Sequence, residues 1–426
     1  MGSHEVIALA IFLLAYGFII SEQIHRTTIA MIGGLLMIAF GIFDQNKAIH
    51  YIDFNTIGLL VGMMIIVSIT AQTGVFEYIA IVSAQKVKGA PIKILIVLSL
   101  FTALASAFLD NVTTVLLVVP VTISITKQLK VPPIPFLLSE IFASNIGGTA
   151  TMIGDPPNLM IGSAVKDLTF MSFIDNLTFI NFIILLVTVL ILTFIYRRQL
   201  KTTNDLRKHL LSKDARHELK DRLLLSKCLI VVILTLLGFF FHQFIHIETA
   251  TIALIGAFIL LLLTGDKYLT TTLEKVEWTT LFFFIGLFVI VGGLVETGLI
   301  GALAKKAMLL TGGEVKSTTF LVLWMSALIS AFVDNIPFVA TMIPLIKEMG
   351  HLGITNLDPL WWSLSLGACL GGNGTLIGAS ANLVVAGLAS KEGHQISFIK
   401  FLVIGFPLML ISILISTIYV YFRYLA

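Results

Sequence analysis

Residues 147–158 read GGTATMIGDPPN and residues 371–382 read GGNGTLIGASAN, two polar, glycine-rich stretches inside long apolar runs. Each is preceded by an Asp-Asn pair, at 110–111 and at 334–335. The offset between the copies is 224 residues for Asp110 and Asp334, for Gly147 and Gly371, and for Asn158 and Asn382. Apolar segments interrupted at corresponding places in two halves of a chain are typical of secondary transporters with broken helices at the binding site.

The composition is that of a membrane protein. Of the 426 residues, 57% are hydrophobic and only 12% are charged, against roughly 25% charged in soluble domains. Several apolar runs approach the ~20 residues that cross a bilayer core. A basic patch with interleaved aromatics is missing, so nucleic acid is not an expected partner. Nor is there a P-loop or a hydrolase motif, and we expect no enzyme activity and no cofactor beyond a proton or Na⁺ as coupling ion.

The duplication extends well beyond the two motifs. Residues 103–108 match 327–332 at the same offset, and Thr28-Ile29-Ala30 matches Thr251-Ile252-Ala253 after a slip of one residue. Seven apolar runs in the first half therefore correspond to seven in the second, and the repeat covers nearly the whole chain.

Counting crossings gives the predicted fold. We take 91–127 and 317–350 as re-entrant hairpins with the Asp-Asn pairs at their tips, and 134–165 and 359–389 as helices broken at the glycine-rich motifs. Each half then has five crossings. Because five is an odd number, the two halves have opposite orientations in the membrane. The prediction is an all-α polytopic membrane protein with inverted repeats at 1–200 and 226–426 and a linker at 201–225. Twelve or more full spans without hairpins would place the Asp-Asn pairs inside ordinary helices, and we disfavour that arrangement.

The charge pattern predicts the orientation. The segment 197–227 carries ten of the 27 Lys and Arg residues, which predicts that it is cytoplasmic and that the protein lies in the cell (inner or plasma) membrane. Aromatic residues are predicted at the membrane interfaces: Trp361, Trp362, Tyr419, Tyr421 and Tyr424.

Four carboxylates are candidates for proton or ion coupling. A carboxylate in the membrane interior costs at least ~2.5 kcal/mol and is functional by default, which applies to Asp110 and Asp334; the alternative is that each accepts hydrogen bonds at a hairpin tip. Asp155 precedes Pro156-Pro157, where a helix can restart, so it is either a coupling residue or only a helix cap. Glu140, whose counterpart is Leu364, is either a proton relay or a residue near the membrane boundary.

The broken helices leave backbone amides and carbonyls free for a solute or a small cation. Candidate substrate-binding residues come from both copies: Asn111, Thr113, Gly147, Gly148, Thr149, Thr151, Asn158, Asn335, Cys369, Gly372, Asn373, Thr375, Ser380 and Asn382. A thiolate at Cys369 could ligate a soft metalloid, although one Cys makes no multi-thiolate site and a small core residue is the alternative. The scattered histidines have no metal-ligand spacing, and no resident metal is expected.

At these motifs the chain resembles the ArsB/NhaD group of the ion transporter superfamily, in particular its arsenite-permease and P-protein branch. The resemblance rests on residues 108–114, 146–158, 334–338 and 366–382. It implies an inverted-repeat carrier whose site lies at the hairpin tips and broken helices and moves by an elevator-type motion. Related dicarboxylate carriers have Ser-Asn-Thr at the tips, where this chain has Asp110 and Asp334. Two carboxylates would repel a dianion, which favours a cation or a neutral solute.

The leading hypothesis from the resemblance is proton-coupled efflux of arsenite or antimonite. A Na⁺/H⁺ antiporter of the same group is the first alternative, and an organic-anion or chloride transporter is the second. A receptor or scaffold without transport would need none of the duplicated broken helices. Expected partners are a small inorganic solute and membrane lipids; a soluble ATPase subunit docked on 197–227 and a homodimer both stay open.

Overall fold

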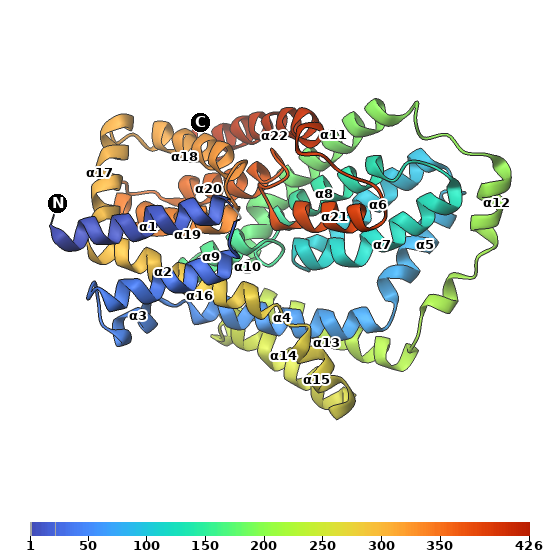
Figure 1. The fold of residues 1–426 in the computed structure, drawn as a ribbon, viewed down its shortest axis with the longest axis horizontal. Coiled ribbons are helices and arrows are strands. Elements are labelled where there is room, and N and C mark those ends of the chain that lie inside the picture. Colours follow the sequence, from blue (N-terminus) through green and yellow to red (C-terminus); the bar gives the residue numbers. More distant parts are fainter. Residues whose placement is uncertain (1, 22) are drawn as a thin grey trace.

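The computed structural model describes residues 2–21 and 23–426, and every regular element in these ranges is a helix (Figure 1). The first half contains α1 (Ser3–Ser21), α2 (Arg26–Ala39), α3 (Gln45–Tyr51), α4 (Phe54–Gln72), α5 (Val75–Lys86), α6 (Pro91–Ser106), α7 (Asn111–Leu129), α8 (Ile134–Thr149), α9 (Pro156–Ala164), α10 (Phe170–Phe173), η1 (Ile174–Thr178) and α11 (Phe179–Tyr196). The second half contains α13 (Arg222–Ile245), α14 (Thr249–Thr264), α15 (Asp266–Glu274), α16 (Trp278–Glu296), α17 (Leu299–Thr311), α18 (Val315–Ser330), α19 (Asn335–His351), α20 (Asp358–Gly371), α21 (Ser380–Lys391), α22 (Phe398–Val420) and η3 (Tyr421–Leu425). Between the halves lie α12 (Asn204–Ser212) and η2 (Ala215–Glu218).

The described chain has seven helical segments that are long and apolar enough to cross a membrane. Shorter apolar helices of 10–17 residues, among them α6 and α18, accompany them. Large apolar side chains face outward, and Leu262, Leu309 and Leu310 are each 82% exposed. Such side chains are stable facing hydrocarbon rather than water. The prediction of an all-helical polytopic membrane protein is confirmed.

The packing repeats the duplication and shows that the halves are inverted. Helix α2 packs on α16, and α4 packs on α14. The two helices within a pair run parallel. In the α2–α16 pair, for example, Ala30 lies beside Gly286 and Met37 lies beside Gly293. The starts of each pair are also tied together: Thr27 Oγ1 donates to the Thr279 carbonyl at 2.7 Å, and the Ala250 amide donates to Asn55 Oδ1 at 3.2 Å. Since α2 corresponds to α14 and α4 to α16, each helix packs on the counterpart of its neighbour, as inverted repeats require.

Two hairpins, α6–α7 and α18–α19, pack on the broken helices of their own halves, α8 and α20. Asp110 and Asp334 stand at the hairpin tips, immediately before α7 and α19. Pro120 and Pro344 lie inside α7 and α19, again 224 residues apart, and each removes a backbone donor from its helix.

The helix breaks lie later than the glycine pairs suggest. Gly147 and Gly148 are still inside α8, which ends at Thr149, and Gly371 is the last residue of α20. Chain direction changes between these ends and the starts of α9 and α21, where Asp155 and Ala379 are extended. The glycines serve close packing instead: a Cβ at Gly147 would lie 2.1 Å from the Ala103 carbonyl oxygen of α6. Both breaks therefore lie inside the glycine-rich motifs 147–158 and 371–382, but after the glycine pairs.

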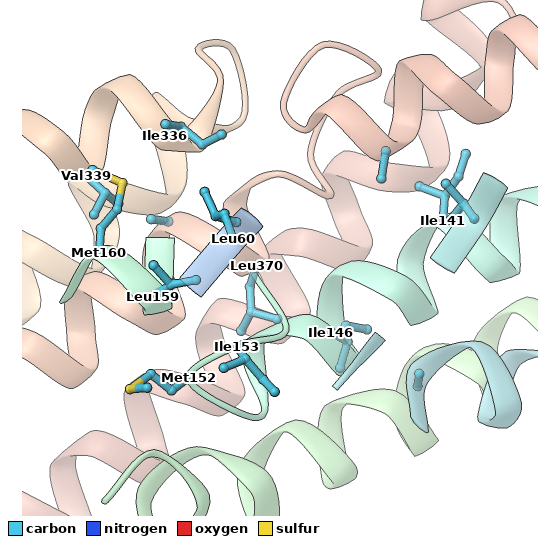
Figure 2. Close-up of a cluster of buried hydrophobic side chains, with 14 of the residues drawn as sticks. Leu60, Ile141, Ile146, Met152, Ile153, Leu159, Met160, Ile336, Val339 and Leu370 are labelled. Atoms are coloured by element: carbon cyan, nitrogen blue, oxygen red, sulfur yellow. The ribbon is translucent and has the colours of Figure 1, made fainter. Parts of the chain in front are cut away.

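The molecule thus contains two helix groups. We call α1, α2, α4, α13, α14 and α16 the scaffold helices, which pack on one another. We call α6–α9, α11 and α18–α22 the hairpin group, in which α9 packs on α19 and α20 packs on α8. In Figure 1, α2, α4, α13, α14 and α16 lie below most of the hairpin group. Figure 2 shows the apolar contact between halves inside the hairpin group, with Met160 of α9 beside Val339 of α19.

The interfacial placement of the two tryptophans was wrong. Trp361 and Trp362 are each 2% exposed, and Trp362 makes an edge contact with Phe173 at 5.2 Å between ring centroids. Tyr419 and Tyr424 both donate hydrogen bonds to Asn176, at 2.6 Å each, and so fix the end of α22 on η1. Trp361 and Trp362 are therefore packed inside the protein and do not face its surface.

Candidate functional site

A cavity of about 230 Å³ lies where the two helix groups meet. Its polar lining comes from one hairpin tip (Asp110, Asn111), the other tip (Asn335), the restarts of the broken helices (Asp155, Ser380) and the scaffold helices (Arg26, Glu277, Thr279, Thr280). Of the sequence-predicted residues, the structure therefore brings five together at this cavity: Asp110, Asn111, Asp155, Asn335 and Ser380.

Asp155 lies between the two hairpin tips. It stands at the N-cap position of α9, yet its side chain makes no capping hydrogen bond. Instead Asn111 Nδ2 donates to Oδ1 at 3.3 Å and Asn335 Nδ2 to Oδ2 at 3.5 Å. The residue is 1% exposed. A capping role thus does not account for this carboxylate, and one amide from each half faces it.

Asp110 is tied to its own hairpin tip. Oδ1 accepts from the Thr113 amide at 2.8 Å, and Oδ2 accepts from Thr113 Oγ1 at 2.5 Å. Asp110 therefore caps α7 and also lines the cavity, so both interpretations of this residue fit the geometry. Thr113 acts on Asp110 and is not itself part of the cavity lining.

Asp334, the counterpart of Asp110, has a different environment. Its Oδ2 accepts from Arg26 Nη1 at 2.5 Å and from Ser380 Oγ at 3.0 Å. Asp334 lines a neighbouring pocket of about 330 Å³ rather than the central cavity. Arg26 and Ser380 line both spaces. The two duplicated aspartates are therefore not equivalent in this structure.

A network of amides joins the halves behind the cavity. Asn111 Nδ2 donates to Asn145 Oδ1 at 3.2 Å, and Asn145 Nδ2 donates to Asn373 Oδ1 at 2.9 Å and to Asn382 Oδ1 at 3.0 Å. Asn382 donates in turn to the carbonyls of Gly372 and Thr375, as its counterpart Asn158 does to those of Thr149 and Thr151. These amides hold the shape of the two breaks.

Most of the remaining predicted residues have the same structural role. Thr151 and Thr375 donate to the carbonyls of Ala107 and Ala331, which fixes each break on its own hairpin. Thr149 donates to the Asn145 carbonyl, and the Cys369 thiol lies 3.6 Å from Asn158 Oδ1. None of the following lines the central cavity: Gly147, Gly148, Thr149, Thr151, Asn158, Cys369, Gly372, Asn373, Thr375 and Asn382.

Glu140 is buried between α7 and α8, at 1% exposure. Its Oε1 accepts from Thr122 Oγ1 at 2.5 Å, while Oε2 has no hydrogen-bond partner among the described residues. Glu140 does not line the central cavity.

Sequence reasoning missed Arg26, Glu277 and Asn145. Arg26 begins α2 and Glu277 precedes α16, so in the sequence both read as boundary residues at the ends of apolar runs. Their placement beside the cavity depends on the contact between α2 and α16, which joins segments roughly 250 residues apart in the sequence. Asn145 carried a signal, because it is an amide in the same apolar helix as Glu140.

The chemistry of the cavity is acidic and rich in amides. Three carboxylates and one guanidinium line it, so at full ionisation it carries excess negative charge. Within the described residues, no three His, Cys, Asp or Glu side chains are placed to hold a metal ion. The lining suits a small cation or a solute that donates hydrogen bonds.

A cavity with a polar lining between inverted repeats of apolar helices defines the class of protein, a polytopic membrane transporter. The chain belongs to the citrate transporter family (CitMHS), whose sequence pattern matches residues 16–367.

Similar proteins agree with this class. An uncharacterized transporter of Mycobacterium tuberculosis is 43% identical over 99% of both chains. The human P protein is 36% identical over 98% of this chain, which spans 60% of the P protein's length, so the P-protein part of the resemblance is confirmed. In fold alone, the chain is similar to the Alcanivorax borkumensis YdaH transporter, whose crystal structure has an unusual topology (TM-score 0.60, 15% identity, 98% of both chains).

Proposed function

We propose that this protein is a proton-coupled secondary transporter that carries a small neutral or cationic solute through the central cavity. One observation carries the proposal: Asp110, Asp155 and Glu277, from three separate segments, line a single cavity together with Asn111 and Asn335. A buried carboxylate favours its neutral form and a nearby cation favours its charged form. Proton release and cargo binding can therefore compete for the same side chains.

The leading cargo in this proposal is arsenite or antimonite, exported from the cell. As a neutral hydroxide it presents several O–H donors, and the carboxylate and amide oxygens of the cavity are acceptors. The volume of about 230 Å³ is large enough for such a solute. The assignment of this cargo rests on the arsenite-permease resemblance of the hairpin tips and broken helices.

Sodium is the alternative cargo, with Asp155 as its main ligand. The carboxylate lies between two amide side chains, and oxygen ligands suit hard cations. Sodium would then bind when Asp155 loses its proton.

Citrate, which the family is described as transporting, meets a like-charged lining in this chain. Three carboxylates against a single guanidinium repel a free tricarboxylate. An organic-anion or chloride pathway would likewise need the cavity carboxylates to be neutralised first. We therefore consider a neutral or cationic cargo to fit this cavity better than an anion.

The two helix groups support an elevator-type motion, with the hairpin group moving past the scaffold helices. The cavity would then be open alternately to the two sides of the membrane. The site residues of the hairpin group would move, while Glu277 would stay with the scaffold helices. We further propose that the linker 197–227 is cytoplasmic and that the protein lies in the cell membrane. The linker would also be the docking surface for an ATPase subunit, if one is used.

The test is a cargo panel in proteoliposomes that contain a pH-sensitive dye and an imposed pH gradient. Arsenite, Na⁺, citrate and chloride are added singly to the wild type and to Glu392→Gln, a control that breaks the exposed Lys127–Glu392 pair. We expect arsenite to change the internal pH in both proteins. A response to Na⁺ alone would move the assignment to the antiporter, and a response to citrate or chloride alone would contradict the proposal.

A further inference from the structure

Arg26 makes the one ion pair that joins the scaffold helices to the hairpin group within the part of the chain described. None of the remaining pairs joins the two helix groups. Lys47–Glu296 links α3 to the scaffold helix α16, and Lys127–Glu392 lies within the hairpin group. Lys213–Glu218 and His217–Asp214 lie in the linker. Arg26 Nη1 lies 2.5 Å from Asp334 Oδ2 and 2.8 Å from Ser380 Oγ. It is therefore placed to hold the second hairpin tip and the start of α21 on the scaffold.

The pair also forms the wall between two spaces. Arg26, Ser380 and Val384 line both the central cavity and the pocket of about 330 Å³ beside it, while Asp334 faces only the latter. The side chains of the pair are 30% and 12% exposed, so water reaches the carboxylate from the neighbouring pocket. A proton can arrive there without passing through the central cavity.

Among the described residues, Arg26 makes no second ion pair, and its position is unfavourable without Asp334. It is the first residue of α2, where the helix dipole disfavours a cation. Its guanidinium also lies 5.0 Å from the centre of the Phe283 ring, which keeps it on the scaffold side. Arg26 stays charged at every relevant pH, so Asp334 is the member of the pair whose charge can change.

In the described chain, the repeat-related position at the start of α14 has no such ion pair. With the one-residue slip between the halves, the counterpart of Arg26 is Thr249, which starts α14. Thr249 lines a pocket of about 410 Å³ together with Asn55 and Ser163, and there the two groups are joined by a neutral hydrogen bond of 3.2 Å between Asn55 and Ser163. Among the described residues, the ion pair is therefore present at only one of the two related positions.

We propose that Arg26 is a positioning residue that locks the hairpin group to the scaffold while Asp334 is ionised, and that a proton on Asp334 releases the lock. The proton comes from the neighbouring pocket and binds Oδ2; the Arg26–Asp334 ion pair breaks and Arg26 keeps its charge. An empty carrier with an ionised Asp334 then cannot move, which prevents the hairpin group from returning without a proton. The inference rests on the proposed transport function and deepens it.

Several other titratable groups surround this pair, and the test must separate them. The charged or titratable neighbours are His25 at the cap of α2, Asp110 at the first hairpin tip, Asp155 before α9 and Glu277 before α16. His25 lines the same pocket as Asp334, so it is the main competing sensor of pH.

The experiment measures a distance between the two groups, in full-length protein in lipid nanodiscs without cargo. Spin labels are placed at two exposed positions, Gln45→Cys on α3 beside the scaffold and Lys400→Cys on α22; the natural Cys228 and Cys369 are buried. In the otherwise unchanged protein we expect one distance at high pH and a second distance that grows as the pH falls. Arg26→Gln and Asp334→Asn should populate the second distance at every pH, at least about tenfold above the unchanged protein at high pH, the factor that 1.4 kcal/mol gives.

Three control variants make the outcome decisive. Arg26→Lys keeps the charge and should restore the single distance at high pH, His25→Gln should retain the pH response, and Lys127→Gln should behave like the unchanged protein. A pH response that survives in Asp334→Asn, or that disappears in His25→Gln, would overturn the proposal. Because no cargo is present, failure of every cargo in the transport panel with a normal distance response would refute the proposed function and leave the lock intact.

Discussion

Asn145 shows how much of the site depends on single side chains that bind no cargo. Its carboxamide bridges Asn111 of one half to Asn373 and Asn382 of the other, and it is fully buried. The side chain therefore orients Asn111 at the cavity and fixes both breaks relative to each other. Asn145 therefore belongs to the site because it positions other residues, although it has no charge and does not line the cavity.

Asn145→Ala should lower the stability of the folded protein markedly. The change leaves Asn111 Nδ2, Asn373 Oδ1 and Asn382 Oδ1 short of a buried partner, and each unsatisfied group costs about 1–3 kcal/mol. The measurement is the apparent melting temperature in detergent, with the exposed Asn204→Ala on α12 as control. Equal melting temperatures for the two variants would contradict the network.

At the same scale, the sequence could predict the polar residues but not their partners. The duplicated Asp110 and Asp334 were predictable as a pair because their offset matches that of the glycine-rich motifs. Their different environments were not, because Arg26 reaches Asp334 through a contact between distant segments and its counterpart Thr249 carries no charge. Asp155 could be placed before a helix start from Pro156 alone, whereas its position between two amides depends on both hairpin tips.

Among the elements, the close approach of α6 and α8 is set by a glycine. A Cβ added at Gly147 would lie 2.1 Å from the Ala103 carbonyl oxygen, whereas one at Gly387 in α21 meets nothing within 4 Å. Gly147→Ala should destabilise the protein by about 1–3 kcal/mol through overpacking, and Gly387→Ala should be neutral or stabilising because alanine favours helix by up to ~1 kcal/mol. Thermal unfolding measures both, and a Gly147→Ala protein as stable as Gly387→Ala would contradict this packing.

The sequence predicted the hairpins and the broken helices well, because both recur at a fixed offset and interrupt apolar runs with residues that cannot continue a helix. It predicted the function of the threonines in the breaks less well. Thr151 and Thr375 looked like free hydroxyls for a solute, yet each binds a hairpin carbonyl 44 residues earlier. Side chains that satisfy the backbone at a break have the same residue types as side chains that bind a polar solute, so composition alone does not separate them.

For the whole molecule, the orientation in the membrane can be tested with single cysteines. If the linker is cytoplasmic, Lys208→Cys on α12 should react only with an impermeant maleimide applied from the cytoplasmic side. Glu248→Cys, in the loop between α13 and α14, should react only from the other side. Both positions are exposed, and the natural cysteines are buried. Labelling of Lys208→Cys from outside would reverse the predicted orientation.

The most direct test of proton coupling at this cavity is proton flux through Asp155→Asn in proteoliposomes under an imposed pH gradient. Asparagine preserves the size of the side chain but cannot exchange a proton. We predict that cargo-dependent proton flux falls about a hundredfold or more, as expected on loss of an essential proton-transfer group, while the protein still folds and unfolds cooperatively in detergent. Proton flux at the wild-type rate in folded Asp155→Asn would contradict the claim that this cavity couples protons to transport.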